Sequence, residues 1–218
     1  MTTFTDLIAP FTLDELASDD ARRAIGLRHG KSNADASALF DWSQFIGISA
    51  TLYDPDNLRV SINRKPVPTQ FYHSDGAIDR EKLDKLVERG ASIIQPDAHR
   101  YHAALGAAVR DFTERTASPL RIGAIGSSGQ AGALALHADK IDLLILQVEG
   151  AKHWRIFDPV FDPEVDDAPP LPIFDDMLEC GQYLFVPKGF AHECDNAGER
   201  SLHLGIGFAK PRYDPWGN

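Results

Sequence analysis

The sequence contains few of the residues that build cross-linked, membrane-spanning or nucleic-acid-binding proteins. Two cysteines among 218 residues are too few for a disulfide framework and are typical of a reducing compartment. Aspartate and glutamate outnumber lysine and arginine by 32 to 22, so the formal charge is −10 and we expect no nucleic-acid partner. The strongest apolar run, residues 143–148, is interrupted by Gln147 and is much shorter than a bilayer span.

The amino terminus does not resemble a secretory signal peptide, because it has no basic stretch followed by a long apolar segment. We therefore expect a cytoplasmic protein without a membrane association. A content of 43% hydrophobic and 25% charged residues is typical of an ordinary globular domain. The length predicts a single domain over residues 1–218, with a helix-rich part at 1–120 and a barrel core at 121–218.

The helical part is best defined at residues 79–89. Leu83, Leu86 and Val87 share one stripe of this helix, Asp79 can cap it, and Gly90 can end it in a left-handed conformation. A capping box is predicted at Thr12 with Glu15. A further helix is expected to start at Pro96-Asp97 and to end before Ser118-Pro119, with His99 and His102 as surface or cap residues near its start.

Strand patterns dominate after residue 121. Strands are predicted there at 141–148, 152–158, 183–186 and 201–208, and one short strand is expected earlier, at 92–95. Residues 159–172 hold five of the fourteen prolines and a cluster of acids, which predicts a surface loop: either a solvated connector or a lid. Helices followed by antiparallel strands indicate an α+β chain with a mainly β core, built as a barrel or sandwich.

Candidate chemistry is concentrated in the strand-rich part. His137 and Asp139 are two positions apart, so on a strand both would point to the same face. His192 follows a Pro/Gly turn just before the last strand. Two histidines and one carboxylate with open coordination positions form the facial triad of non-haem Fe(II) oxygenases. A lone His-x-Asp also arises by chance as a surface pair.

Several segments resemble the cupin-like JmjC oxygenases, the group that includes the ribosomal oxygenases. The segment HADKIDLLILQVEGAKHWRIFDP, starting at His137, is similar to their metal-binding core, and LECGQYLFVPKGFAH and SLHLGIGF are similar to its second half. LRVSINRKPVP from Leu58 and GASIIQPDAHRY from Gly90 extend the similarity over nearly the whole chain. The resemblance implies a double-stranded β-helix, a cupin or jelly-roll barrel with the amino-terminal helices packed on it.

The resemblance also implies an activity: an Fe(II)- and 2-oxoglutarate-dependent dioxygenase that uses O₂ to hydroxylate a C–H bond. His137, Asp139 and His192 occupy the iron-ligand positions. Strand alternation puts Lys152, Trp154 and Ile156 on one face and His153, Arg155 and Phe157 on the other. The resemblance implies that Lys152 binds the distal carboxylate of 2-oxoglutarate, since a lysine on the inner face of a barrel needs an anionic partner. Without the resemblance, an exposed Lys152 in an edge strand would be the better interpretation. Ser201 and His203 share a face of the last strand and are further candidates for co-substrate contact, although His203 is equally well interpreted as a structural histidine.

Two positions depart from the pattern of the group. Gly205 stands where relatives often carry Ser or Thr, and the strand at 121–126 lacks the Asn and Tyr often found there. The chain ends about ten residues beyond the last predicted strand, so we expect the catalytic domain without the dimerisation and winged-helix parts of the ribosomal oxygenases. Their substrate is therefore not implied by the fold.

Other functions remain open on sequence alone. The chain could be a metal-dependent cupin of another reaction type, such as a 2-oxoglutarate-independent dioxygenase or an isomerase, or a non-catalytic binding module. The substrate could be a protein, a peptide or a small molecule. A homodimer is the commonest state of a soluble homo-oligomer. Cys194, two residues after His192, is expected to be a packed thiol and not a ligand.

Overall fold

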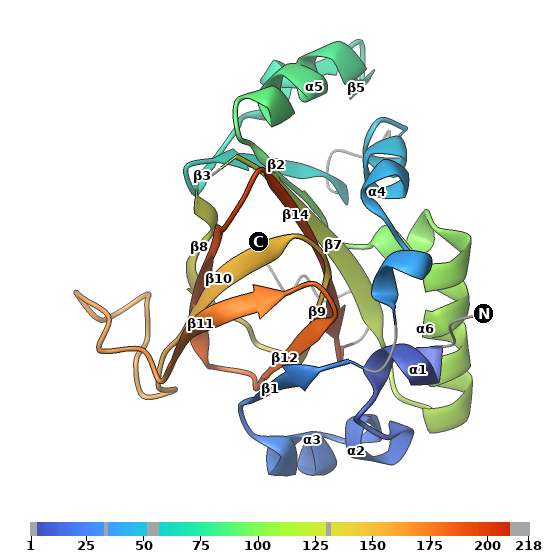
Figure 1. The fold of residues 1–218 in the computed structure, drawn as a ribbon, viewed down its shortest axis with the longest axis vertical. Helices are drawn as coiled ribbons and strands as arrows, with labels where there is room; N and C mark the ends of the chain where they lie inside the picture. Colours follow the sequence, from blue (N-terminus) through green and yellow to red (C-terminus); the bar gives the residue numbers. More distant parts are fainter. Residues whose placement is uncertain (1–3, 33–34, 52–56, 130–131, 210–218) are drawn as a thin grey trace.

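The computed structural model describes residues 4–32, 35–51, 57–129 and 132–209, and shows a β-barrel with helices on one side (Figure 1). The helices are α1 (Phe4–Ile8), α2 (Leu13–Ala17), α3 (Asp19–Ile25), α4 (Trp42–Ser49), α5 (Arg80–Glu88) and α6 (Ala103–Thr116). The strands are β1 (Arg28–Lys31), β2 (Arg59–Ile62), β3 (Lys65–Pro66), β4 (His73–Ser74), β5 (Ala77–Ile78), β6 (Ser92–Gln95), β7 (Arg121–Ser128), β8 (Gly132–Ala138), β9 (Leu143–Glu149), β10 (Ala151–Ile156), β11 (Phe174–Glu179), β12 (Gln182–Val186), β13 (Ala191–Asn196) and β14 (Arg200–Gly207).

Two antiparallel sheets face one another to form the barrel. The larger sheet has the strand order β1-β12-β9-β14-β7-β6-β2-β3, and the smaller sheet has the order β11-β10-β13-β8. β4 and β5 form a separate hairpin. The predicted α+β class with a mainly β core, a double-stranded β-helix carrying the amino-terminal helices, is confirmed.

The central strand β9 explains why the run at 143–148 is so apolar. Leu144, Leu146 and Val148 belong to the core between the large sheet and the helices, whereas Leu143 and Ile145 belong to the core between the two sheets. A strand covered on both faces has no solvent side to carry polar residues. Gln147 shares the inner face with Leu143 and Ile145, and this side chain points into the barrel.

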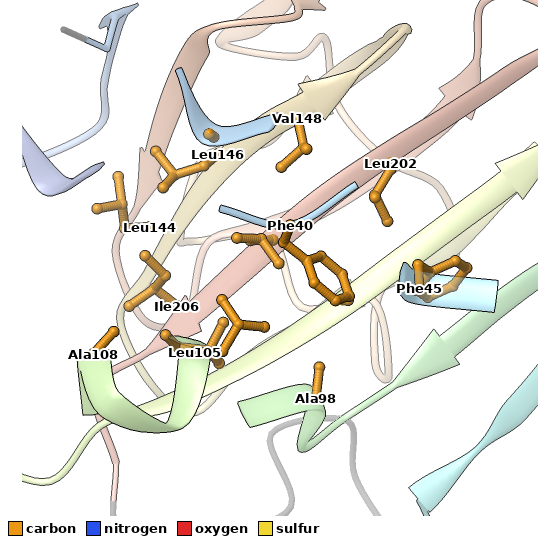
Figure 2. Close-up of a cluster of buried hydrophobic side chains, with 14 of the residues drawn as sticks. Phe40, Phe45, Ala98, Leu105, Ala108, Leu144, Leu146, Val148, Leu202 and Ile206 are labelled. Carbon is orange, nitrogen blue, oxygen red and sulfur yellow. The ribbon is translucent and has the colours of Figure 1, made fainter. Parts of the chain in front are cut away.

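The helix-facing core joins the amino-terminal half to the large sheet (Figure 2). Phe40, Phe45 and Leu105 pack against side chains of β9 and β14, and each of the three is fully buried. Burial of such a side chain contributes about 1.5–3 kcal/mol to folding. None of the helices in the described residues is long and apolar enough to cross a lipid bilayer.

Most predicted helix ends are confirmed. The Thr12–Glu15 capping box is present, the Asp79 side chain caps α5, and Gly90 adopts a left-handed conformation with φ of +87°. The helix expected from Pro96 begins later, at Ala103, after a short 3₁₀ turn at Ala98–Arg100. His102 caps α6 as expected, but His99 is not a surface residue: its ring lies 3.2 Å from the Ile122 carbonyl.

The division of the chain at residue 120 stays a prediction. The first half nevertheless contributes β1, β2, β3 and β6 to the large sheet, and sequence patterns identified only β6 among these strands. The four residues of β1, RHGK, include no apolar side chain and so show no strand period. β2, RVSI, does alternate polar and apolar residues over its four positions, and this short signal was missed.

The packing of α4 on β7 can be tested with two glycines. A side chain added at Gly126 in β7 would overlap the buried ring of Phe45, whereas one added at Gly47 in α4 would meet no atom within 4 Å. We expect Gly126→Ala to lower the free energy of unfolding by about 1–3 kcal/mol. We expect Gly47→Ala to leave it unchanged or raise it by up to about 1 kcal/mol. Urea unfolding of both variants measures this difference, and equal effects would contradict the packing described.

Candidate metal centre

The centre is built by the pairing of β8 with β13. His192 lies directly opposite His137 in this ladder, and Cys194 lies opposite Leu134. Two residues of β13 are thus matched by three of β8, which is a β-bulge. Without the bulge, Leu134 and His137 would point to opposite faces because their separation is odd. The bulge therefore lets Leu134 pack in the core between the sheets while His137 faces His192.

The three predicted ligands are brought together. One donor atom from each of His137, Asp139 and His192 lies within 4.8 Å of the others. The His192 Nε2 atom is 3.6 Å from Asp139 Oδ2, and the His137 Nε2 atom is 4.0 Å from Asp139 Oδ1. His192 and Asp139 are buried, with side-chain exposures of 1% and 3%, whereas His137 is 28% exposed. The centre thus has one side toward solvent.

The backbone sets the tautomer of both histidines. The Nδ1 atom of His137 lies 2.7 Å from the Ala135 carbonyl, and that of His192 lies 2.9 Å from the Phe190 carbonyl. A carbonyl only accepts, so each Nδ1 carries the proton and each Nε2 carries the lone pair. Outer hydrogen bonds of this kind orient metal-ligating histidines.

Burial keeps the two rings neutral. Desolvation and, to a smaller extent, the neighbouring His137 lower the pKa of His192 to about 3. Desolvation also lowers the pKa of His137. Only a neutral imidazole can bind a metal. Among the described residues, the buried Nε2 atom of His192 has no hydrogen-bond partner. Two neutral imidazoles and a carboxylate at this spacing fit a divalent transition metal.

Lys152 lies inside the barrel. It shares the buried face of β10 with Trp154 and Ile156, as the alternation predicted. On the outer face, His153 contacts Asp175 and Arg155 forms an ion pair with Glu193. Lys152 is fully buried, and its Nζ atom donates to the Ile125 carbonyl at 3.1 Å and to His203 Nδ1 at 2.9 Å. Within the described part of the chain it contacts no carboxylate. Burial lowers the pKa of Lys152 to about 8.

His203 and Trp154 connect Lys152 to the centre. Because His203 Nδ1 accepts from Lys152, its proton is on Nε2, and burial together with the nearby ammonium lowers the pKa of His203 well below its usual value. The Trp154 ring lies edge-on to His203, with centroids 5.3 Å apart, and 6.1 Å from the His192 ring. A continuous row of buried side chains thus runs from the ammonium to the candidate ligands.

Further polar groups line the inner wall of the barrel. Ser201 is fully buried on the inner face of β14, and its Oγ atom has no hydrogen-bond partner in the described residues. The buried atoms Gln147 Oε1 and Trp154 Nε1 also have no hydrogen-bond partner in the described residues. Sequence patterns missed Gln147 and Trp154 as site residues. Strand alternation could have identified them, because Gln147 shares a face of β9 with Ile145 and Trp154 shares a face of β10 with Lys152.

Cys194 is a packed thiol, as expected. It is fully buried in the core between the sheets, opposite Trp154 in the β10–β13 ladder. Desolvation raises its pKa to about 11, which disfavours the thiolate that would bind a metal. Gly205, the departure noted in the last strand, leaves room in the wall: an added Cβ would contact only a Leu143 methyl group, at 3.5 Å.

The two facing sheets and the His-Asp-His cluster at the β8–β13 ladder define a cupin-type barrel with a candidate mononuclear metal centre. The JmjC domain family matches residues 107–215, which is 109 of the 218 residues. The chain belongs to this family.

Similar proteins include several named ribosomal oxygenases. Ribosomal oxygenase 1 of Danio rerio is 34% identical over 95 residues, 38% of this chain and 17% of that protein. The ribosomal protein uL16 3-hydroxylase of Escherichia coli is 28% identical over 138 residues, 60% of this chain and 37% of that protein. YcfD, a ribosomal oxygenase from Escherichia coli, superimposes with a TM-score of 0.55 at 25% identity, over 78% of this chain and 44% of that structure. The chain thus spans less than half the length of each of these relatives.

Metal binding by the cluster gives a direct prediction. We expect the protein to bind one equivalent of Co(II), and His192→Ala and Asp139→Ala to lose at least about 100-fold in affinity, because each removes a donor from a three-residue set. His153→Ala is the matched control, since its ring faces outward and pairs with Asp175. Visible absorption during Co(II) titration measures binding. Equal affinity in all three variants would exclude the cluster as the metal site.

Proposed function

We propose that the protein is an Fe(II)- and 2-oxoglutarate-dependent oxygenase that hydroxylates a C–H bond of a protein substrate. The observation that carries the proposal is the meeting of three side chains within 4.8 Å of one another in a barrel that also buries a lysine without an acidic partner among the described residues. The first feature suits a metal and the second suits an anion. An iron enzyme with a dicarboxylate co-substrate needs both.

Related proteins support this reaction class. The names of the relatives are those of oxygenases and hydroxylases of ribosomal proteins. A YcfD structure, which matches this chain at 24% identity and a TM-score of 0.56, contains cobalt and 2-oxoglutarate. The fold therefore accommodates a divalent metal together with this co-substrate. A protein substrate is the choice most consistent with these relatives.

In this proposal His137, Asp139 and His192 hold the iron. Neutral histidines with oriented lone pairs and one carboxylate leave the remaining coordination positions for co-substrate and O₂. When bound, iron(II) would couple oxidative decarboxylation of 2-oxoglutarate to insertion of one oxygen atom into a substrate C–H bond, with succinate and CO₂ as by-products. The exposed side of His137 is where a substrate would approach.

Lys152 would bind the distal carboxylate of 2-oxoglutarate. Its buried ammonium donates hydrogen bonds to the Ile125 carbonyl and to the His203 imidazole. Neither neutral group compensates a buried positive charge as a carboxylate does. His203 would hold the ammonium in place through Nδ1, and the Ser201 hydroxyl would supply a hydrogen bond that Gly205 cannot. We also propose a cytoplasmic location, which is consistent with two free cysteines.

A metal-dependent cupin that does not use 2-oxoglutarate is the second candidate. Gly205 favours it, because this position carries no hydroxyl toward a co-substrate. The roles of Lys152 and Ser201 distinguish the two candidates, since a cupin without 2-oxoglutarate needs neither to bind a dicarboxylate.

The reaction class can be tested by succinate formation. With Fe(II), ascorbate, O₂ and 2-oxoglutarate, we expect slow succinate release without substrate, and at least about tenfold faster release with a hydroxylatable peptide from a ribosomal-protein panel. His137→Ala should abolish both, while His153→Ala should retain both. Mass spectrometry should show a gain of one oxygen atom in the peptide. Absence of iron-dependent succinate from the wild type would contradict the proposal.

The lysine predicts a pH dependence of co-substrate binding. Lys152 is charged below its pKa of about 8, and only the ammonium can pair with the carboxylate. Affinity for 2-oxoglutarate should be constant up to that pH and should then fall by about tenfold per pH unit, because binding must take up one proton. Anaerobic calorimetry of the Mn(II)-loaded protein between pH 6.5 and pH 9.5 measures this.

Two variants of Lys152 distinguish the effect of its charge from the effect of its size. We expect Lys152→Met to bind 2-oxoglutarate at least about 100-fold more weakly at pH 7, with no loss in unfolding free energy, since methionine removes a buried charge. Lys152→Arg stays charged, so any binding it retains should show no fall above pH 8. Unchanged affinity in Lys152→Met would support the cupin that does not use 2-oxoglutarate.

A further inference from the structure

The loop between β10 and β11 exposes an unusual number of large apolar side chains. Val160, Val165, Leu171 and Ile173 are 88%, 76%, 90% and 50% exposed, and only two other large apolar side chains in the described residues, Phe71 and Tyr101, are classed as exposed. The loop projects from the barrel on the side opposite α6 (Figure 1). Apolar side chains gathered on one exposed segment mark an interaction surface.

The loop forms a shallow groove that is open to solvent. The groove has a volume of about 620 Å³ and is lined by Val160, Phe161, Ala168 and Pro170 together with Asp158, Asp166 and Asp167. Its backbone is held in place by side chains of its own. Val160 N–H donates to Asp158 Oδ1 at 2.9 Å, and Asp162 N–H donates to Asp166 Oδ2 at 2.8 Å. Five prolines restrict the remaining freedom, so the groove is formed before any partner arrives.

The floor of the groove packs on the two strands that carry His137 and His192. Phe157 and Phe161 are buried against Ala191, Leu136 and Ala138, and the Phe157 N–H donates to the Ala191 carbonyl at 2.9 Å. These residues are the chain neighbours of the candidate ligands, since Ala191 precedes His192, and Leu136 and Ala138 flank His137. Because successive residues of a strand point to opposite faces, the floor of the groove lies on the outer face of the sheet whose inner face carries the two histidines. A chain lying in the groove would therefore lie behind the ligand-bearing strands.

Charge selects the kind of partner. The loop carries Asp158, Asp162, Glu164, Asp166 and Asp167, and no lysine or arginine occurs between Arg155 and Lys188. None of these five acids forms an ion pair within the described residues. Unpaired carboxylates around an apolar groove attract cationic chains and repel phosphate-bearing partners, both nucleic acids and acidic lipid surfaces.

We propose that this groove docks an extended segment of the protein substrate in which aliphatic side chains are flanked by lysine or arginine. The aliphatic side chains would contact Val160 in the lining and the exposed Leu171 that follows Pro170 in the chain. The basic side chains would pair with Asp158, Asp166 and Asp167. The inference rests on the proposed function, because it names the recognition element that brings a substrate to that centre. Docking on the strands that carry the centre keeps the substrate on the enzyme and so raises the effective concentration of the reacting side chain.

Binding selection tests the preference without a known substrate. The probe is a random decapeptide display library selected on the full chain, followed by anisotropy titrations of individual labelled peptides. We expect the selected pool to be enriched in lysine and arginine next to leucine, isoleucine or valine, and the affinity of its members to fall as salt rises. A pool without basic enrichment would overturn the proposal.

Variants locate the binding. Asp166→Asn with Asp167→Asn removes charge from the groove, and Val160→Ser with Leu171→Ser removes its apolar contacts. Each pair should weaken the selected peptides by about tenfold. Glu88→Gln with Glu114→Gln is the matched control, since it makes the same change in net charge on the exposed surfaces of α5 and α6 and should leave affinity unchanged. Undiminished binding to the groove variants would also overturn the proposal.

The same proteins separate this inference from the proposed function. Both groove variants should bind Co(II) and release succinate without substrate as the wild type does, whereas His137→Ala should lose both and still bind the peptides. Peptide binding that fails while metal binding persists rejects the groove alone. Sedimentation of the wild type and the groove variants tests whether a second copy of the chain occupies the groove instead. A dimer that is lost only in the groove variants would show this and would overturn the proposal.

Discussion

The antiparallel pairing of β8 with β13 is the interaction on which the rest of the site depends. It sets His137 opposite His192, and one extra residue in β8 turns His137 to the inner face although Leu134 is already there. β13 is shared, because its other edge pairs with β10 and places Trp154 opposite Cys194 and Lys152 opposite Asn196. A shift of this single strand by one residue would turn the histidine, the thiol and the amide outward together.

The closed barrel gives these groups their chemical properties. Water is excluded from His192, Lys152 and His203, so desolvation favours the neutral form of each and lowers each pKa. The neutral form allows an imidazole to bind a metal, and the ammonium of Lys152 contacts a carbonyl and an imidazole but no carboxylate among the described residues. The loop between β10 and β11 extends the same strands to the outside. The sheet of four strands thus carries the two candidate histidine ligands, Lys152 and the loop, and the larger sheet closes over them and supplies His203.

Sequence patterns predicted those parts of the site that depend on local periodicity. The alternation in β10 correctly assigned Lys152 to the inside and His153 to the outside, and the resemblance to JmjC oxygenases selected the two histidines and the aspartate that the fold brings together. The bulge in β8 was not predictable, because nothing in the segment ALALHAD marks where pairing slips. β1 could not be predicted because its four residues, RHGK, have no apolar period, whereas the alternation in the four residues of β2, RVSI, was a short signal that was overlooked.

The sequence by itself determined the elements, the alternation of their faces and the acidic, apolar composition of the loop at 159–172, since these follow from the identity of neighbouring residues. The tertiary structure alone decided which faces meet. His192 is 55 positions from His137, and His203 is 51 positions from Lys152. Only closure of the two sheets brings such residues into contact. The same closure removes water, so the pKa of the lysine and the neutrality of the histidines are properties of the fold and not of the residues.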